Sequence, residues 1–182
     1  PLTVRDARAA LRAAGTPDAL AAGPAPTADE RAAAPGEPLL TARDVTVAHG
    51  PREVLTGITL EVAEGEVVAV LGRNGSGKTT LLRALAGVAE PARGTVTAHR
   101  RTAFVPQEPD SLLFSPTVRA ELAATLDLLG QTDDGAVDRW LDRLGLHDLA
   151  DRHPRSLSVG QRQRVAIAAV AVGEAEVLVL DE

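Results

Sequence analysis

The sequence contains no cysteine and no methionine, and its only aromatic residues are two phenylalanines and one tryptophan. Without cysteine the chain has neither a disulfide framework nor a thiolate metal site, and a reducing compartment is compatible with this composition. The chain opens on Pro1 and stops after the apolar run VLVLDE. With no methionine, it is expected to be a fragment of a longer protein.

Clustered positive charge and long hydrophobic runs are also missing. The net charge is −6, and no stretch concentrates the basic residues that binding to a nucleic-acid backbone requires, so no nucleic-acid partner is expected. The longest apolar-rich runs, VLTGITLEV and RVAIAAVAVG, are shorter than the roughly 20 residues that cross a bilayer. Direct membrane insertion is therefore not expected, and any link to a membrane must go through a partner.

Residues 1–38 are rich in alanine, proline and glycine, with mixed charges and few large apolar side chains. This composition cannot form a core and predicts a flexible linker. Within it, the capping box of Thr3 and Asp6 and the stop at Gly15 predict a short helix from Val4 to Ala14.

From residue 39 onward the pattern is that of a folded domain. LLTARDVTVAH and ITLEV alternate apolar and polar residues, as half-buried antiparallel strands do. GEVVAVL is apolar on both faces and predicts a central strand of a covered parallel sheet. TTLLRALAGV predicts a helix, and GTVTAH, RTAFV and EVLVL predict further strands.

Helices dominate the second half of the domain. Residues 117–149 are predicted to be helical with breaks at Gly130 and Gly145, and a last helix is predicted near Val159–Gly173. The order of strand, helix, strands, helical insert, helix and strand predicts an α/β domain with an all-helical inset.

The stretch VLGRNGSGKTT contains the pattern G-x-x-x-x-G-K-[ST] between an apolar run and a helix. Its glycines let the backbone curl so that successive N–H groups cradle phosphate oxygens, next to the positive end of the helix. Thr79 offers its hydroxyl to Mg²⁺. The residues expected to bind nucleotide phosphates here are Gly72, Arg73, Asn74, Gly75, Ser76, Gly77, Lys78, Thr79 and Thr80.

Lys78 is the only lysine in a chain with eighteen arginines. Its compact ammonium on a flexible stem can reach between the β- and γ-phosphates, where a planar guanidinium is too broad. The phosphate-binding loop by itself leaves kinases, GTPases and motor ATPases open.

The stretch VLVLDE predicts a buried strand that ends in two carboxylates. Asp181 can bind Mg²⁺ through water, and Glu182 can polarise an attacking water. Glu182 and Lys78 are therefore expected to be catalytic.

A third motif lies in SLSVGQRQRVAIA. Ser158 is a good helix N-cap, Gly160 allows close backbone approach, and the start of the helix can face an anion. Arg162 and Arg164 are expected to contact the neighbours of this helix rather than nucleic acid.

Together the three motifs resemble those of ATP-binding cassette (ABC) ATPases, whose usual signature is LSGGQ; here Val159 replaces a glycine. The resemblance covers residues 39–182. It implies a P-loop NTPase (RecA-like) core with an antiparallel β subdomain and a helical subdomain at about 111–160, truncated after the Walker B motif. It also implies that Gln107, in FVPQEP, contacts Mg²⁺ and the attacking water as the catalytic Q-loop glutamine, and that His49 stands where an aromatic residue stacks on adenine.

The family works as a pair of cassettes that enclose two ATP molecules, so the resemblance implies ATP and Mg²⁺ as ligands and a second cassette as partner. The residues implied to act on one ATP are Lys78, Thr79, Gln107, Asp181 and Glu182, with Thr79, Gln107 and Asp181 as metal ligands. The residues implied to complete the partner's site are Ser158, Gly160 and Gln161.

The stretch PQEPDSLLFSPTVRAEL is similar to the Q-loop region of energy-coupling-factor (ECF) type importers of vitamins and metal ions. This similarity implies an ATPase that energises import, with transmembrane subunits as partners, at the cytoplasmic face of the cell membrane. The linker would then join a first cassette to this one; the alternative is a plain N-terminal extension. The alternative is a soluble ABC ATPase acting on ribosomes or DNA. Transport is favoured because about eighty residues separate Lys78 from Ser158, too few for a long coiled coil.

Overall fold

The computed structural model describes residues 37–181. The helix predicted at Val4–Ala14, nearly all of the predicted linker and the carboxylate of Glu182 lie outside the described residues. The described part contains two small sheets and several helices, so the predicted α/β class is confirmed.

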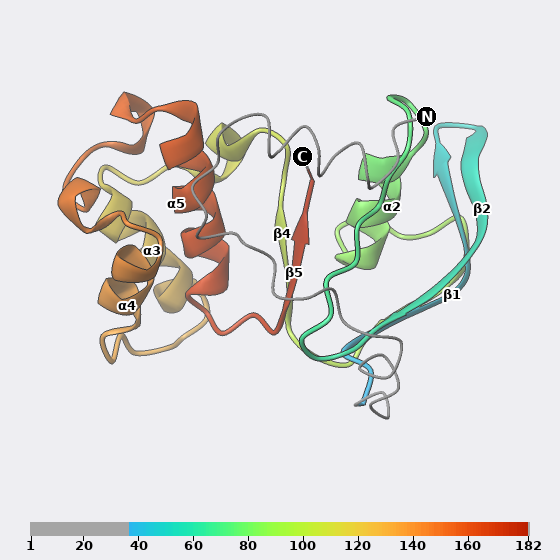
Figure 1. Ribbon diagram of the computed structural model, residues 1–182, viewed down its shortest axis with the longest axis horizontal. Coiled ribbons are helices and arrows are strands. Elements are labelled where there is room, and N and C mark those ends of the chain that lie inside the picture. Colours follow the sequence, from blue (N-terminus) through green and yellow to red (C-terminus); the bar gives the residue numbers. More distant parts are fainter. Residues whose placement is uncertain (1–36, 182) are drawn as a thin grey trace, which may run out of the picture. The chain divides into compact units, whose positions relative to one another are not determined.

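Three strands form an antiparallel sheet in the order β2, β1, β3, and the paired strands β1 and β2 lie side by side in Figure 1. They are β1, Leu40–His49; β2, Arg52–Val62; and β3, Arg93–Ala98. β1 lies in the middle, and its inward residues Val45 and Val47 are at most 2% exposed. Strands were predicted at all three places, for β1 and β2 from the alternation of apolar and polar residues, and β2 begins several residues before the predicted ITLEV.

β4, Thr102–Val105, and β5, Val177–Leu180, form a separate parallel pair. Parallel strands need a long crossover, and the helical part of the chain, which ends in α5 at Val159–Ala171, provides it. Because both strands run in the same direction, the residues that follow them lie at the same edge. This edge brings the loop of Gln107 beside Asp181.

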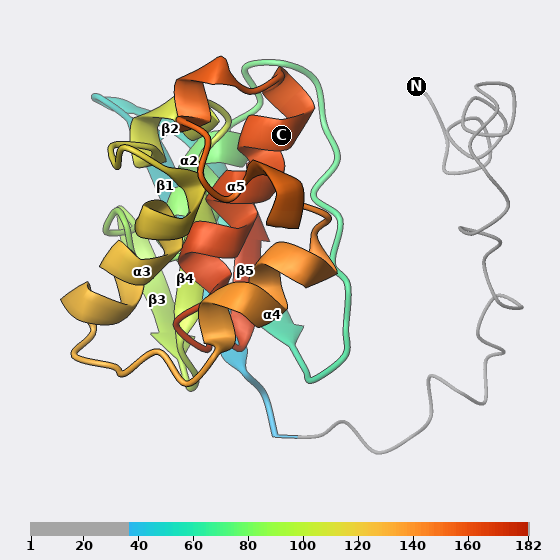
Figure 2. The same cartoon turned by 90° about the vertical axis from the view of Figure 1, so that its left-hand side faces the viewer.

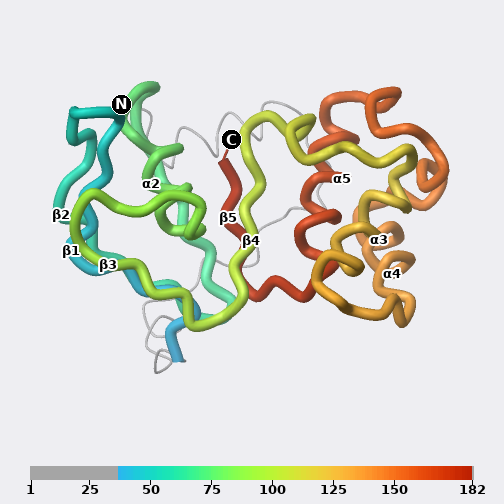
Figure 3. The backbone as a smooth tube through the Cα atoms, turned by 180° about the vertical axis from the view of Figure 1, so that it is seen from behind, coloured from blue at the N-terminus to red at the C-terminus, as the bar shows by residue number. Residues whose placement is uncertain are grey.

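The strand predicted for GEVVAVL is wrong. Residues 66–73 have no regular secondary structure and lead from the end of β2 towards α2 (Figure 3). Val67 is 95% exposed and Leu71 is 76% exposed. A run that is apolar on both faces needs pairing strands and a covering layer, and no strand within residues 37–181 pairs with it. The pattern gives a strand propensity, but the neighbours of the segment decide whether a strand forms.

The helices begin and end close to their predicted bounds. α2 spans Lys78–Leu85, and three further helices pack together in the second half of the chain (Figure 2): α3, Val118–Leu128; α4, Ala136–Arg143; and α5. Short 3₁₀ turns occupy Pro109–Leu112, His147–Leu149 and Pro154–Ser156. Gly130 and Gly145 have φ angles of 64° and 61°, so the predicted helix breaks are confirmed.

The buried side chains form two clusters. One lies within the helical group around Leu141, and the other lies between β1, α2 and β5 around Val45. Trp140 packs against the first cluster and Phe104 against the second.

Candidate functional site

The glycine-rich loop passes so close to its neighbours that a side chain at Gly77 or Gly72 would force a nearby side chain to move. Gly77 has a φ of 93°, and a Cβ there would lie 2.9 Å from Val54 Cγ2 and 3.2 Å from Leu55 Cγ. A Cβ on Gly72 would lie 2.8 Å from Ser76 Oγ. The loop therefore curls tightly beneath β2, as the phosphate-cradle prediction requires.

Lys78 folds back across this loop. Its Nζ donates hydrogen bonds to the backbone oxygens of Gly72, at 3.0 Å, and Arg73, at 3.1 Å. A primary ammonium has three protons, so one remains for a ligand while the other two fix its position. The positive charge of Lys78 is thereby fixed beside the backbone of the glycine-rich loop.

The start of α2 has unpaired donors. Its N-cap is Gly77, which has no side chain to accept from the first turn, and the first turn contains no acidic residue. The N–H groups at the start of a helix carry partial positive charge and bind anions when no cap occupies them. Lys78 and this helix start therefore present positive charge to the same space.

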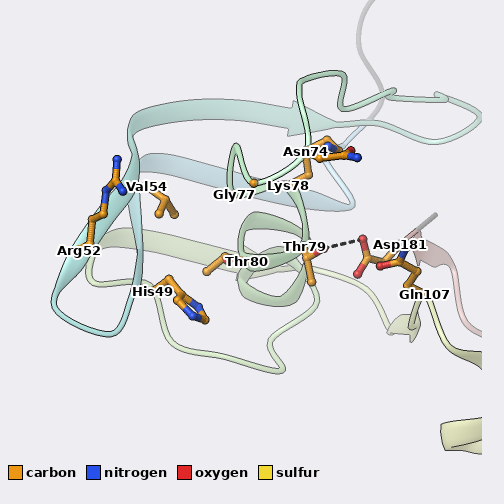
Figure 4. A pocket seen from close by; sticks show the side chains of 11 residues that line it. His49, Arg52, Val54, Asn74, Gly77, Lys78, Thr79, Thr80, Gln107 and Asp181 are labelled. Carbon is orange, nitrogen blue, oxygen red and sulfur yellow. Dashed lines mark hydrogen bonds between the residues drawn. The ribbon is translucent and has the colours of Figure 1, made fainter.

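Thr79 connects α2 to the edge of the parallel pair. Its Oγ1 donates to Asp181 Oδ1 over 3.0 Å. Asp181 is 7% exposed, and its backbone N–H donates to Val105 O at the end of β4. Gln107 lies two residues beyond the end of β4 and is exposed. A hydroxyl, a carboxylate and an amide thus meet at one edge (Figure 4).

These groups line one cavity of about 540 Å³. The phosphate loop and the oxygen-rich edge lie at one end, and the hairpin of β1 and β2 lies at the other (Figure 4). Its lining residues are His49, Arg52, Val54, Asn74, Gly75, Gly77, Lys78, Thr79, Thr80, Gln107 and Asp181. Sequence reasoning missed Arg52 and Val54, although the place of Arg52 next to the tip of the hairpin that carries His49 could have indicated the first of them.

Several predicted site residues lie outside the cavity lining. Gly72, Arg73 and Ser76 shape the loop from behind, without lining the cavity. The predicted signature residues Ser158, Gly160 and Gln161 begin α5 and do not line it either. Glu182 lies outside the described residues.

The start of α5 is closed by its own side chains. Ser158 Oγ accepts from the Gln161 N–H at 3.3 Å, and Gln161 Oε1 accepts from the Ser158 N–H at 2.9 Å, which confirms the predicted N-cap. Among residues 37–181, a Cβ at Gly160 would meet no atom within 4 Å apart from its chain neighbours and the backbone of its own helix. The surface beside Gly160 is therefore open.

The two arginines of this helix contact its neighbours, as predicted. Arg162 Nη1 donates to Leu157 O at 2.6 Å, and Arg164 Nη1 donates to Leu144 O at 2.7 Å. Arg162 Nε is buried and lies 2.7 Å from Asp110 Oδ1. The N–H of that nitrogen is not aligned for a hydrogen bond, so this last contact is electrostatic rather than directional.

Comparison with known proteins identifies the family. The model of the ABC transporter family matches residues 55–182, well over half of the chain. The chain belongs to the ABC transporter family. An ABC transporter ATP-binding protein from Streptomyces avermitilis is 42% identical over 146 residues, which are 71% of this chain and 56% of that protein. The aliphatic sulfonates import ATP-binding protein SsuB 1 from Mesorhizobium japonicum is 43% identical over 140 residues, which are 73% of this chain and 53% of that protein.

A solved structure shares the fold. It is CbiO1 from Clostridium perfringens, described as part of the ABC transporter complex CbiONQ, with a TM-score of 0.68 and 31% identity over 80% of this chain and 65% of that one. This likeness confirms the predicted P-loop NTPase fold. The chain spans little more than half the length of the two curated relatives above. Within residues 37–181, no helix has the length and hydropathy of a membrane span.

Proposed function

We propose that the chain is the ATP-binding and ATP-hydrolysing part of an ABC transporter and energises transport across a membrane. The observation that carries the proposal is the meeting of Lys78, Thr79, Asp181 and Gln107 in one cavity beside a glycine-rich loop. Membership of the family supports the same function.

ATP fits the cavity in one direction. Its volume of about 540 Å³ lies within the usual range for small-molecule sites. The glycine-rich loop, Lys78 and the uncapped start of α2 lie together at one end, and only that end combines a cation with free backbone N–H groups, so the phosphates belong there. The base then points towards His49 on the hairpin, which agrees with the predicted stacking position.

The residues at the oxygen-rich edge suit Mg²⁺, which takes one or two carboxylates together with substrate phosphates and water. Thr79 Oγ1 and Asp181 Oδ1 lie 3.0 Å apart, and Gln107 lines the same cavity. No group of three acidic or histidine side chains that could hold a metal ion occurs in the described part of the chain, so phosphate oxygens and water would complete the ligand set. Thr79, Asp181 and Gln107 would hold Mg²⁺, which supplies charge neutralisation when bound.

Hydrolysis then depends on positioning. Lys78 donates to the phosphate oxygens on which negative charge develops, and the unpaired N–H groups of α2 stabilise the same charge. Gln107 holds the attacking water, and Glu182, next in sequence to Asp181, orients or deprotonates it. The role of Glu182 rests on its place in the sequence and on the family.

A second cassette is part of the proposal. Ser158, Gly160 and Gln161 do not line this chain's own cavity, and the surface beside Gly160 is open. Those three residues would complete the ATP site of a second cassette, whose own signature would complete this one. Transmembrane subunits would place the pair at the cytoplasmic face of the cell membrane.

The finer proposal is ECF-type import of a vitamin or a metal ion. One observation supports it: the similarity of PQEPDSLLFSPTVRAEL to the Q-loop region of ECF importers. A sulfonate import protein is 43% identical to this chain, so the ECF class rests on that short stretch alone. In this proposal residues 1–38 are a linker that follows a first cassette, and residues 39–182 form the ATP-binding domain.

Substitution of Lys78 tests the function. In the assembled transporter, Lys78→Ala is expected to lower ATP turnover at least about a hundredfold, because the loop loses its fixed charge. Lys78→Arg is also expected to lower ATP turnover strongly, because the guanidinium is too broad to fold back on Gly72. The matched control is Arg83→Ala, which removes an exposed cation from the same helix.

Glu182→Gln separates binding from chemistry. This variant should keep ATP affinity and lose most turnover. Near-normal turnover in both Lys78→Ala and Glu182→Gln would contradict the proposed function.

A further inference from the structure

The hairpin that closes one end of the cavity contains a bulge that directs side chains towards the phosphate loop. Ala48 pairs with Glu53 and Val47 pairs with Leu55, so Val54 is an extra residue in β2. Such a bulge turns two consecutive side chains to the same side of a sheet. Both Val54 and Leu55 indeed lie against the position of Gly77.

The alternation on the other side of the bulge places Arg52. Glu53 faces away from the loop, because its carboxylate makes an ion pair with Arg93 on β3 at 2.8 Å. Neighbouring residues of a strand point to opposite faces, so Arg52 shares the face of Val54. Arg52 also pairs directly with His49 across the hairpin, and both line the cavity (Figure 4).

The guanidinium of Arg52 is unengaged. It makes no hydrogen bond or ion pair with any residue between 37 and 181, whereas Arg93 on the same sheet is paired. The only carboxylate that lines the cavity is Asp181, at the opposite end. Nothing in the described part of the chain therefore draws this cation away from a ligand.

The end of the cavity near the hairpin has no phenylalanine or tryptophan side chain, so the imidazole of His49 is the one aromatic ring among the described lining residues. Phe104 and Trp140 pack against the two cores, and Phe114 is not among the lining residues. A nucleotide base placed here would meet His49, Val54 and the guanidinium of Arg52. A guanidinium is planar, stacks on aromatic rings and offers five donors.

We propose that Arg52 holds the nucleotide base: its guanidinium stacks on the purine and donates to acceptor atoms at the edge of the ring, together with His49. This inference rests on the proposed function, because it needs a nucleotide whose phosphates occupy the loop of Lys78. It assigns the base a partner on β2, in addition to the histidine on β1. Purine nucleoside triphosphates are the ligand class that this end of the cavity fits, since adenine and guanine both present an N7 acceptor.

Binding of three ligands to the whole protein tests the proposal. ATP, GTP and inorganic tripolyphosphate are titrated against the unmodified protein, Arg52→Ala and a control, Arg43→Ala, which removes an exposed arginine from β1 outside the cavity. Arg52→Ala should weaken ATP and GTP about fivefold and leave tripolyphosphate unchanged. Arg43→Ala should change none of the three affinities. Retained tripolyphosphate binding also shows that Arg52→Ala is folded.

Other outcomes overturn the proposal in distinguishable ways. Equal weakening of all three ligands would mean that Arg52 contacts phosphate rather than base. Unchanged ATP affinity in Arg52→Ala would show that Arg52 does not contact the nucleotide, and the proposed function would still stand. If ATP fails to bind the unmodified protein, and Lys78→Ala makes no difference to any ligand, the proposed function falls together with this inference.

The variant Arg52→Lys separates charge from shape. A lysine keeps the positive charge and loses the planar group. The ATP affinity of Arg52→Lys should therefore fall as far as that of Arg52→Ala. An ATP affinity equal to that of the unmodified protein would overturn the stacking geometry.

Discussion

The helices α2 and α5 both begin at glycine-containing motifs, yet their N-termini differ. α2 starts after Gly77, has no capping side chain and carries Lys78 across its loop. α5 starts after Ser158, whose side chain forms a complete capping box with Gln161. One helix start is left open towards a cavity within the chain, and the other is satisfied by the chain itself.

This difference separates two ways of using a helix start. An uncapped start has donors without a partner in the chain, which water or a ligand can satisfy, so folding leaves it ready for an anion. A capped start is already stable, and it offers a fixed surface to something outside the chain. The comparison fits a site in which α2 holds the phosphates of its own ATP and α5 serves the partner cassette.

Exchanging glycine for alanine at the two motifs should give the largest contrast. Gly77→Ala places a Cβ 2.9 Å from Val54 at a φ of 93°. A non-glycine residue in left-handed backbone costs about 1–2 kcal/mol, and the contact with Val54 adds to it. We expect a lower free energy of unfolding in chemical denaturation and loss of most ATP affinity.

Gly160→Ala is the matched control, because its new methyl group meets nothing in the described part of the chain beyond its own helix. Within a helix, alanine in place of glycine stabilises by about 0.5–1 kcal/mol. This variant should therefore unfold at a higher denaturant concentration. Its own phosphate loop should bind ATP with unchanged affinity. Equal loss of ATP affinity in the two variants would show that the two helix starts do not differ as described.

Local patterns predicted most of these features from the sequence. The phosphate loop, the start of α2 at Lys78, the cap at Ser158 and the carboxylate of Asp181 each depend on residues within a few positions of one another. Such features follow from backbone chemistry and need no knowledge of distant segments.

Features that depend on pairing between distant segments were not predictable in this way. GEVVAVL has the composition of a central strand and lacks a pairing partner within the described chain, so it remains irregular. The bulge at Val54 breaks the period-two pattern of β2. The alternation of the sequence therefore did not indicate which face of the sheet Arg52 shares with the phosphate loop.

Removing the caps of two helices gives a smaller effect. Ser158→Ala and Thr117→Ala each remove a side chain that accepts from the third residue of a helix. Both should lower the free energy of unfolding by about 1 kcal/mol. Only Ser158→Ala should also lower ATP turnover of the paired cassettes, because Thr117 begins α3, outside the three sequence motifs. Similar turnover of these two variants would contradict a role for Ser158 in the partner's site.

The smallest effect is expected from the ion pair of Arg162 with Asp110, which joins the start of α5 to the turn that follows Gln107. Asp110 is 60% exposed at its side chain, so solvent screens the pair and a double-mutant cycle should give a coupling of about 0.5 kcal/mol. Asp110→Asn is expected to lower ATP turnover about twofold, because the Gln107 loop loses its attachment to α5. The matched control is the ion pair of Arg119 with Asp138 at 2.8 Å, whose two residues lie on α3 and α4. Asp138→Asn should leave turnover unchanged, and an equal loss in the two asparagine variants would mean that Asp110 does not connect the two motifs.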